Sequence, residues 1–144
     1  MKEVTGNLWD YLGLCPLVIT TGGQVSRRGN ALMLRGCAAE ARKRFPGIER
    51  ELGALIEHNG NRVFALSHSI VSFPVEESPN DLPDIGIIRR SCRELVELTN
   101  MRNWPQVAMP RPGCGSGGLA WGDVAPVLHD ILDSRFIVVS FADP

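Results

Sequence analysis

Two glycine-rich segments are places where backbone N–H groups could bind an anion. Gly22 and Gly23 follow a short apolar run, and the segment PRPGCGSGGLAW (110–121) contains four glycines. Glycine lets the backbone turn tightly or approach a ligand closely. Since each segment follows a predicted strand and leads toward a helix, successive N–H groups and the positive end of that helix would favour a phosphate or diphosphate. The alternative, that both segments are only tight connections, stays open.

Few side chains offer nucleophilic or acid–base chemistry. Of the 15 Lys and Arg residues only Lys2 and Lys43 are lysines, and Arg binds phosphate and carboxylate groups rather than acting as a nucleophile. Glu76 or Glu77 could supply a carboxylate that stabilises an oxocarbenium-like centre, although a solvated loop charge is the commoner role. His68 is expected near the same edge of the sheet, where a lone histidine is more often structural than catalytic.

The composition is that of an ordinary globular chain and excludes several classes of protein. It has 144 residues, 44% of them hydrophobic and 22% charged, with a formal net charge of −1. The length favours one domain over residues 1–144, and the low charge disfavours general nucleic-acid binding. The four cysteines lack CxxC or zinc spacing, so no metal or cofactor is expected, and Cys37 and Cys92 are expected to be small buried residues. Without a membrane-length apolar run or a signal-like start, we expect no membrane association and a cytoplasmic protein.

Hydrophobic periodicity predicts strands that alternate with helices. Runs rich in Val, Ile and Phe predict strands at residues 17–20, 62–67, 69–75, 106–110 and 135–141. Amphipathic spacing predicts helices over about residues 37–45, 48–59, 83–101 and 121–131. Pro83 is expected in the first turn of the third helix and Asp123 at the N-cap of the last. This order is typical of an α/β domain, so we expect a three-layer α/β/α sandwich around a mixed, mostly parallel sheet.

Gly113, Gly115 and Gly118 also match the dinucleotide-binding motif G-x-G-x-x-G. In a Rossmann fold this motif opens the first βαβ unit, and further units follow it. Here it lies in the last quarter of the chain, with one helix and one strand after it. A Rossmann-type nicotinamide site is therefore disfavoured.

Three segments carry a resemblance to a known family: VTGNLWDY (4–11), VITTGGQVSRRGNALMLRGCAAEARKRFPG (18–47) and PRPGCGSGGLAWGDVAPVL (110–128). In this order they resemble the macrodomains, small α/β/α modules that bind ADP-ribose, and they span nearly the whole chain. The last segment is similar to the second phosphate-binding loop of bacterial and phage macrodomains. The resemblance implies that the partner is ADP-ribose or a related NAD-derived nucleotide, free or attached to protein or nucleic acid.

The resemblance implies ligand contacts from both loops. The first loop would surround the distal ribose and the diphosphate with Thr20, Thr21, Gly22, Gly23, Arg35, Gly36, Cys37 and Ala38. The second would wrap the diphosphate with Arg111, Gly113, Cys114, Gly115, Ser116, Gly117, Gly118 and Leu119. Leu34 stands where related sequences usually have Gly, while Met33 is expected in the core. Leu119 and Trp121 are also expected to lock the second loop onto the following helix.

The resemblance places the adenine between Asn7, Leu8 and Phe141. Macrodomains usually have an Asp at the position of Asn7, so this chain lacks a charge-assisted bond to the adenine amino group. The alternative role of Asn7 is that of a simple turn residue. Phe141 stands where an apolar neighbour of adenine is common, with a core or C-terminal plug as its alternative.

Whether the protein is an enzyme stays open. The group nearest in pattern contains the terminal ADP-ribose glycohydrolases and DNA-ADP-ribose antitoxins. Its mechanism resembles one with a Lys after the SFPV-like strand and, in some members, an Asp in the second loop; here these positions read Glu76 and Gly117. We therefore expect a module that binds ADP-ribose. One alternative is an ADP-ribosyl hydrolase without a catalytic Lys, with Glu76 as its candidate, and another is a protein that sequesters an NAD-derived signal nucleotide.

Overall fold

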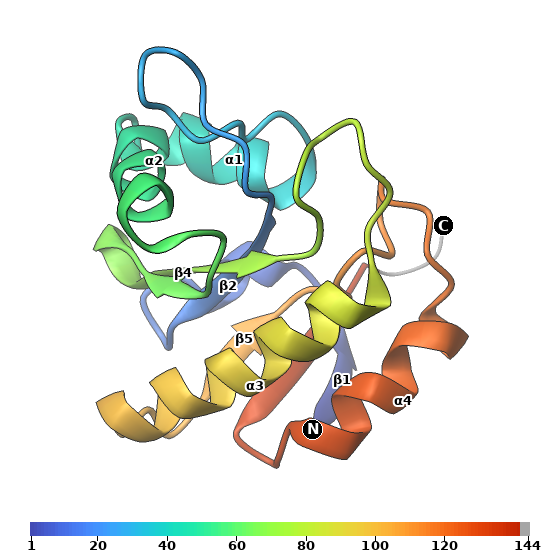
Figure 1. The fold of residues 1–144 in the computed structure, drawn as a ribbon. Coiled ribbons are helices and arrows are strands. Elements are labelled where there is room, and N and C mark those ends of the chain that lie inside the picture. The colour runs from blue at the N-terminus through green and yellow to red at the C-terminus, as the bar shows by residue number, and fades with distance from the viewer. Residues whose placement is uncertain (142–144) are drawn as a thin grey trace.

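A computed structural model describes residues 1–141, which are built around one six-stranded sheet (Figure 1). The strands lie in the order β1-β6-β5-β2-β4-β3. Neighbouring strands are parallel, except that β3 runs antiparallel to β4. Their bounds are β1 Lys2–Thr5, β2 Leu17–Thr21, β3 Phe64–Ala65, β4 Ile70–Pro74, β5 Val107–Met109 and β6 Phe136–Ser140.

Helices cover both faces of the sheet, which confirms the predicted three-layer α/β/α sandwich with a mixed, mostly parallel sheet. Figure 1 shows α1 and α2 on one face and α3 and α4 on the other. The helices are α1 Gly36–Arg44, α2 Ile48–Asn59, α3 Ile85–Arg102 and α4 Trp121–Ile131, with short 3₁₀ turns at Leu8–Tyr11 and Ser67–Ser69. The further prediction of a single domain over residues 1–144 stays a prediction.

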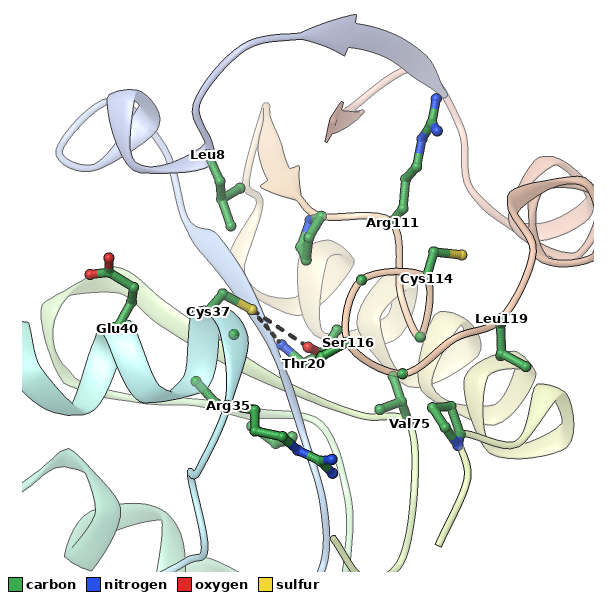
Figure 2. Close-up of a pocket in the computed structure, with 18 of the residues that line it drawn as sticks. Leu8, Thr20, Arg35, Cys37, Glu40, Val75, Arg111, Cys114, Ser116 and Leu119 are labelled. Atoms are coloured by element: carbon green, nitrogen blue, oxygen red, sulfur yellow. Dashed lines mark hydrogen bonds between the residues drawn. The ribbon is translucent and has the colours of Figure 1, made fainter. Parts of the chain in front are cut away.

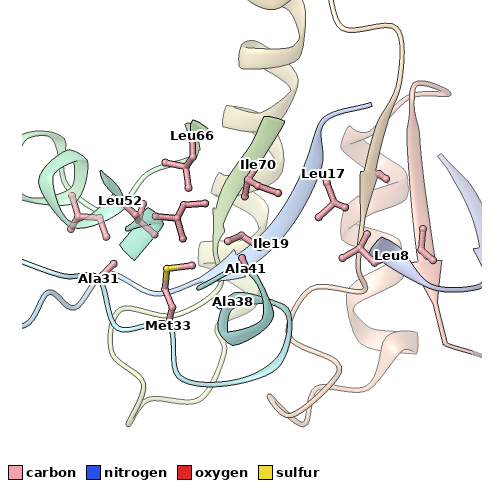
Figure 3. Packing of buried hydrophobic residues seen from close by; sticks show 14 of the residues in the cluster. Leu8, Leu17, Ile19, Ala31, Met33, Ala38, Ala41, Leu52, Leu66 and Ile70 are labelled. Atoms are coloured by element: carbon pink, nitrogen blue, oxygen red, sulfur yellow. The ribbon is translucent and has the colours of Figure 1, made fainter. Parts of the chain in front are cut away.

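Alternating side chains of the strands build two separate cores. In β2, Leu17 and Ile19 face α1 and α2, whereas Val18 faces α3 and α4. Strand β6 alternates in the same way, as the pleat of a strand requires. Figure 3 shows the first core, in which Met33 is 1% exposed, as expected for a core residue. The sheet is therefore rigidly held from both faces at the level of its central strands.

The structure differs from the predicted elements at a few ends. Strand β1 was not predicted, because its four residues KEVT show no apolar alternation and are held by pairing with β6 at the sheet edge. Pro83 precedes α3 rather than lying in its first turn, because the Asp84 side chain accepts from the Ile87 N–H and caps the helix. Asp123 is the third residue of α4 and not its N-cap, which is Ala120. An acidic residue there still suits the positive end of the helix.

Helix α2 is docked tightly on the segment that precedes α1, and Gly53 makes this contact possible. A Cβ at Gly53 would collide with the carbonyl oxygen of Gly29 and lie 3.0 Å from the amide nitrogen of Ala31. We expect Gly53→Ala to lower the free energy of unfolding by about 1–3 kcal/mol, although alanine normally favours a helix. Denaturant unfolding measures the effect. Gly122→Ala in α4, where the Cβ would meet open space, is the control; equal effects of the two changes would contradict the docking argument.

Candidate functional site

A cavity of about 770 Å³ lies where the parallel strands end (Figure 2). Ligands of open α/β sheets bind at the carboxyl ends of the strands, and the volume is typical of a small-molecule site. Residues that follow β1, β2, β4, β5 and β6 line it, together with the start of α1. The sheet order places the segments after β1 and β6 at one end, the two glycine-rich loops in the middle, and the segment after β4 at the other end.

The first loop and the start of α1 form one wall of the cavity. The Sγ of Cys37 lies 3.4 Å from the Thr20 nitrogen, whose N–H donates to it, and 3.5 Å from the Thr20 hydroxyl oxygen. This contact ties the first turn of α1 to the end of β2 (Figure 2). The N-cap residue, Arg35, makes no side-chain cap, so the first N–H groups of α1 keep their capacity to bind an anion. The cavity is lined by Thr20, Thr21, Gly22, Arg35, Gly36, Cys37 and Ala38. Their contacts with a ligand stay a prediction.

The second loop is closed on itself and presents backbone donors. Gly113 has a φ of 74°, which favours glycine, and its carbonyl accepts from the Leu119 N–H at 2.9 Å. Among residues 1–141 no protein acceptor takes the N–H groups of Gly115, Ser116 and Gly117. Three successive donors of this kind form a natural cradle for an anion.

The two loops face each other across the cavity. A Cβ on Gly36 would lie 4.0 Å from the Ser116 hydroxyl oxygen. The second loop also rests on the segment before α3, since a Cβ on Gly117 would come within 2.6 Å of the Pro83 side chain. As expected, Leu119 and Trp121 pack against the core beneath this loop. A ligand between the loops would therefore meet backbone from both sides.

The end of the cavity beside β1 and β6 is mostly apolar. Leu8 is 4% exposed and Phe141 is 75% exposed, so Phe141 lines the cavity and the alternative of a buried plug is wrong. The Gly6 N–H donates to the Ser140 carbonyl at 2.7 Å and holds this corner together. Asn7 also lines the cavity, and its Oδ1 accepts from the Trp9 N–H at 2.9 Å. Asn7 is therefore a turn residue that also lines the cavity, and its contact with a base stays a prediction.

The end beside β4 carries carboxyl groups. Glu76 follows β4 and lines the cavity, and its Oε2 is buried without a hydrogen-bond partner among the described residues. Burial raises the pKa of the Glu76 carboxyl; nearby Arg35 opposes this shift and Asp81 adds to it. The Arg35 Nη2 in turn donates to the Pro79 carbonyl at 2.9 Å. Glu76 is thus a half-buried acid of the cavity rather than an ordinary loop charge.

Three predicted residues contribute less than expected. Gly23 and Gly118 do not line the cavity: the Gly23 N–H donates to the Glu77 carbonyl, and the Gly118 N–H donates to Gly115. Arg111 lines it, but its side chain points away from the loop in Figure 2. Its guanidinium carbon lies 4.8 Å from the centroid of the Trp121 ring, and its Nη2 lies 3.8 Å from Glu3 Oε1.

Two expectations about single side chains are wrong. His68 lies before β4, at the opposite end of that strand from the cavity, where it stacks on Phe45 with ring centroids 4.3 Å apart. Cys37 is half-buried and lines the cavity instead of being a small core residue.

Cys92 is fully buried as expected, and this burial raises the pKa of its thiol to about 12. Lys43 is exposed on α1.

Sequence reasoning missed the residues that reach the cavity from α1 and from the segment after β4. The Arg44 guanidinium carbon lies 4.5 Å from the centroid of the Trp9 ring, and Arg44 pairs with Glu40 at 3.4 Å. In the sequence, Glu40 and Arg44 resemble a solvated helix face, and their i,i+4 spacing is the one signal of a pairing between them. Asp81 and Leu82 lie in a stretch without a motif. Residues 1–141 contain no cluster of His, Cys, Asp and Glu that could hold a metal ion, and no helix among them could cross a membrane.

Comparison with known proteins identifies the fold. No family model matches the chain. A DNA ADP-ribosyl transferase–DNA ADP-ribosyl glycohydrolase fusion protein of Thermosipho africanus is 29% identical over 98 residues, which are 67% of this chain but only 25% of that protein. The Thermus aquaticus DarG macrodomain superimposes with a TM-score of 0.79 at 21% identity, covering 99% of this chain and 97% of its own. Thermosipho africanus DarTG, solved in complex with ADP-ribose, gives 0.77 at 17% identity, covering 96% of this chain and 41% of its own. These likenesses show a common fold.

The raised pKa of Glu76 predicts that this side chain affects stability differently at low and at high pH. Because burial disfavours the charged carboxylate in the folded protein, Glu76 costs stability as the pH rises from its ordinary pKa through the raised one. Glu76→Gln removes this cost. We therefore expect the melting temperature of the variant, relative to the wild type, to be more favourable at about pH 7.5 than at about pH 4.

Thermal unfolding at both pH values measures this difference. Glu57→Gln makes the same chemical change on the exposed face of α2 and serves as the control. If both variants respond alike to pH, the argument that Glu76 is desolvated by the cavity is wrong.

Proposed function

We propose that this chain, whose fold is that of the macrodomains, binds ADP-ribose or a closely related NAD-derived nucleotide in the cavity. The observation that carries the proposal is the row of N–H groups at Gly115, Ser116 and Gly117, which no acceptor within residues 1–141 takes. They face the uncapped start of α1 at Gly36. Together they suit a diphosphate, because backbone donors and a helix N-terminus both favour negative charge.

The arrangement of the cavity matches the parts of such a nucleotide. Its middle, between the two loops, would hold the diphosphate. The end lined by Leu8, Val139 and Phe141 offers apolar surface for a flat base. The opposite end, beside Glu76, would receive the distal ribose and whatever group is attached to it. A ligand laid across the strand ends in this way meets apolar surface, donors and a carboxyl group in turn.

The comparisons support this proposal without extending to the attached group. One solved relative of the same fold was obtained with ADP-ribose and another with ADP. The chain spans about a quarter of the curated relative that it matches, so the activities of that whole protein are not carried over. Attachment of the nucleotide to protein or nucleic acid, and a location in the cytoplasm, stay parts of the proposal.

Binding of ADP-ribose depends on bare backbone at Gly115. A Cβ there meets open space and so leaves the fold intact, but it would occupy the cavity where a phosphate oxygen approaches. We expect titration calorimetry to show ADP-ribose binding to the wild type and a loss of about tenfold or more in Gly115→Ala, or roughly 1.4 kcal/mol. Gly122→Ala, which also faces open space but does not line the cavity, should bind like the wild type.

Two results would contradict the proposal that ADP-ribose binds in the cavity. It fails if the wild type shows neither heat nor a thermal shift with ADP-ribose at millimolar concentration. Unchanged affinity in Gly115→Ala would show that the ligand does not lie against the second loop.

A second candidate function, hydrolysis of an ADP-ribosyl bond, is favoured by the state of Glu76. Its buried Oε2 and raised pKa describe a carboxyl group that holds its proton more readily than a solvated one. Such a group could protonate the atom that leaves the anomeric carbon of the distal ribose, while water adds to that carbon. The products would be free ADP-ribose and the protonated leaving group.

Hydrolysis predicts a different set of results from binding alone. ADP-ribose should be released from modified protein or from modified nucleic acid, in which the attached group leaves the anomeric carbon, and the rate should fall as the pH rises through the raised pKa of Glu76. O-acetyl-ADP-ribose, whose ester bond breaks at the acetyl carbonyl carbon, is a separate substrate that tests ester hydrolysis. Glu76→Gln should lower this rate about 100-fold or more while still binding ADP-ribose. Chromatographic detection of ADP-ribose measures release. Binding without turnover on any of these substrates would leave a reader or a sequestering protein.

A further inference from the structure

The side-chain amide of Asn7 has a defined orientation. Its Oδ1 accepts from the Trp9 N–H at 2.9 Å and caps the 3₁₀ turn Leu8–Tyr11. Only the oxygen of an amide can accept such a bond, so the NH₂ group is the other end of the side chain. Within residues 1–141 that Nδ2 donates to no protein acceptor. Asn7 therefore brings two unused donors to the lining of the cavity.

The surroundings of Asn7 identify what these donors would meet. Leu8 and Val139 are buried at this end of the cavity, and Phe141 is an exposed aromatic ring at its edge. Apolar floor and an aromatic edge suit a flat base, which stacks on such surfaces. The base of a bound nucleotide would therefore lie beside Asn7, with the diphosphate toward the glycine-rich loops.

The hydrogen-bonding edges of the purines differ at position 6. Adenine presents an amino group there, which is a donor, whereas guanine presents a carbonyl oxygen, which is an acceptor; hypoxanthine presents the same carbonyl. An Asp at position 7 would cap the turn equally well with one oxygen and offer the other to the adenine amino group. Asn7 offers donors instead, which the 6-carbonyl oxygen accepts directly, whereas adenine offers them only its ring nitrogens.

We propose that Asn7 removes the preference of the site for adenine, so that nucleoside diphosphates of a 6-oxopurine bind at least as tightly as those of adenine. This inference rests on the proposed nucleotide binding and concerns the base alone. It makes Asn7 a residue that determines specificity through the direction of one hydrogen bond.

The test compares ADP, IDP and GDP by titration calorimetry on the whole chain. For the wild type we expect the ratio of Kd for IDP to Kd for ADP to be about one or less, and for Asn7→Asp to rise roughly tenfold. Because Asp retains the cap to Trp9, the variant should fold, which its melting temperature checks. Asn100→Asp adds the same charge on the exposed surface of α3 and should leave the ratio unchanged. The GDP arm shows whether the added 2-amino group of guanine is also accepted.

The outcomes separate this inference from the proposal on which it rests. If ADP binds the wild type about tenfold more tightly than IDP, or if Asn7→Asp leaves the ratio unchanged while both nucleotides bind, the inference is wrong and nucleotide binding stands. If none of the three nucleotides binds the wild type, nucleotide binding itself is overturned.

Discussion

The hydrogen bond from the Leu119 N–H to the Gly113 carbonyl, at 2.9 Å, closes the loop on which the whole site depends. It requires Gly113 at a positive φ, where a side chain would be strained and would strike Leu119. With the loop closed, the N–H groups of Gly115 to Gly117 are left without acceptors among the described residues. A turn that satisfied these donors internally would be more stable alone but could not receive an anion. The loop is held instead by packing, because Gly113 and Gly117 lie against Pro83 and Gly113 also lies against Ile88 of α3.

The opposite wall of the cavity also leaves backbone N–H groups available for a ligand. The start of α1 is left uncapped by Arg35, and the Cys37 sulfur fixes it to the end of β2 through Thr20. Strands β2 and β5 are neighbours in the sheet, so the loops that follow them meet over its middle. One core lies on each face of the sheet, and each is built from alternate residues of β2 and β6. These cores hold the strands, and with them the two loops, in place. Rigidity of the sheet is thus what makes two separate glycine-rich segments into one site.

Polarity changes along the cavity from one edge of the sheet to the other. Apolar surface at Leu8 and Phe141 gives way to backbone donors at the centre and then to the Glu76 carboxyl. The two ends of the cavity also differ in which polar atoms of their side chains have hydrogen-bond partners. Asn7 has one end of its amide satisfied and one free, whereas the buried Glu76 oxygen has no partner among residues 1–141. In the functions proposed above, specificity for the base therefore depends on the β1–β6 end, and hydrolysis on the β4 end.

By itself, the sequence determined the alternation of strands and helices and the two glycine-rich loops, because periodicity and glycine act over short distances along the chain. The resemblance carried by these segments, rather than periodicity, named many of the residues that line the cavity, including Ser116 and Phe141. Only the tertiary structure decided which end of β4 faces the cavity. The sequence therefore placed His68 at the wrong end of that strand and did not reveal that an oxygen of Glu76 is buried. The tertiary structure also added the edge strand β1 and brought Glu40, Arg44 and Asp81 to the cavity. Pairing with β6 and the burial of one carboxylate oxygen depend on distant neighbours in three dimensions, which local patterns do not contain.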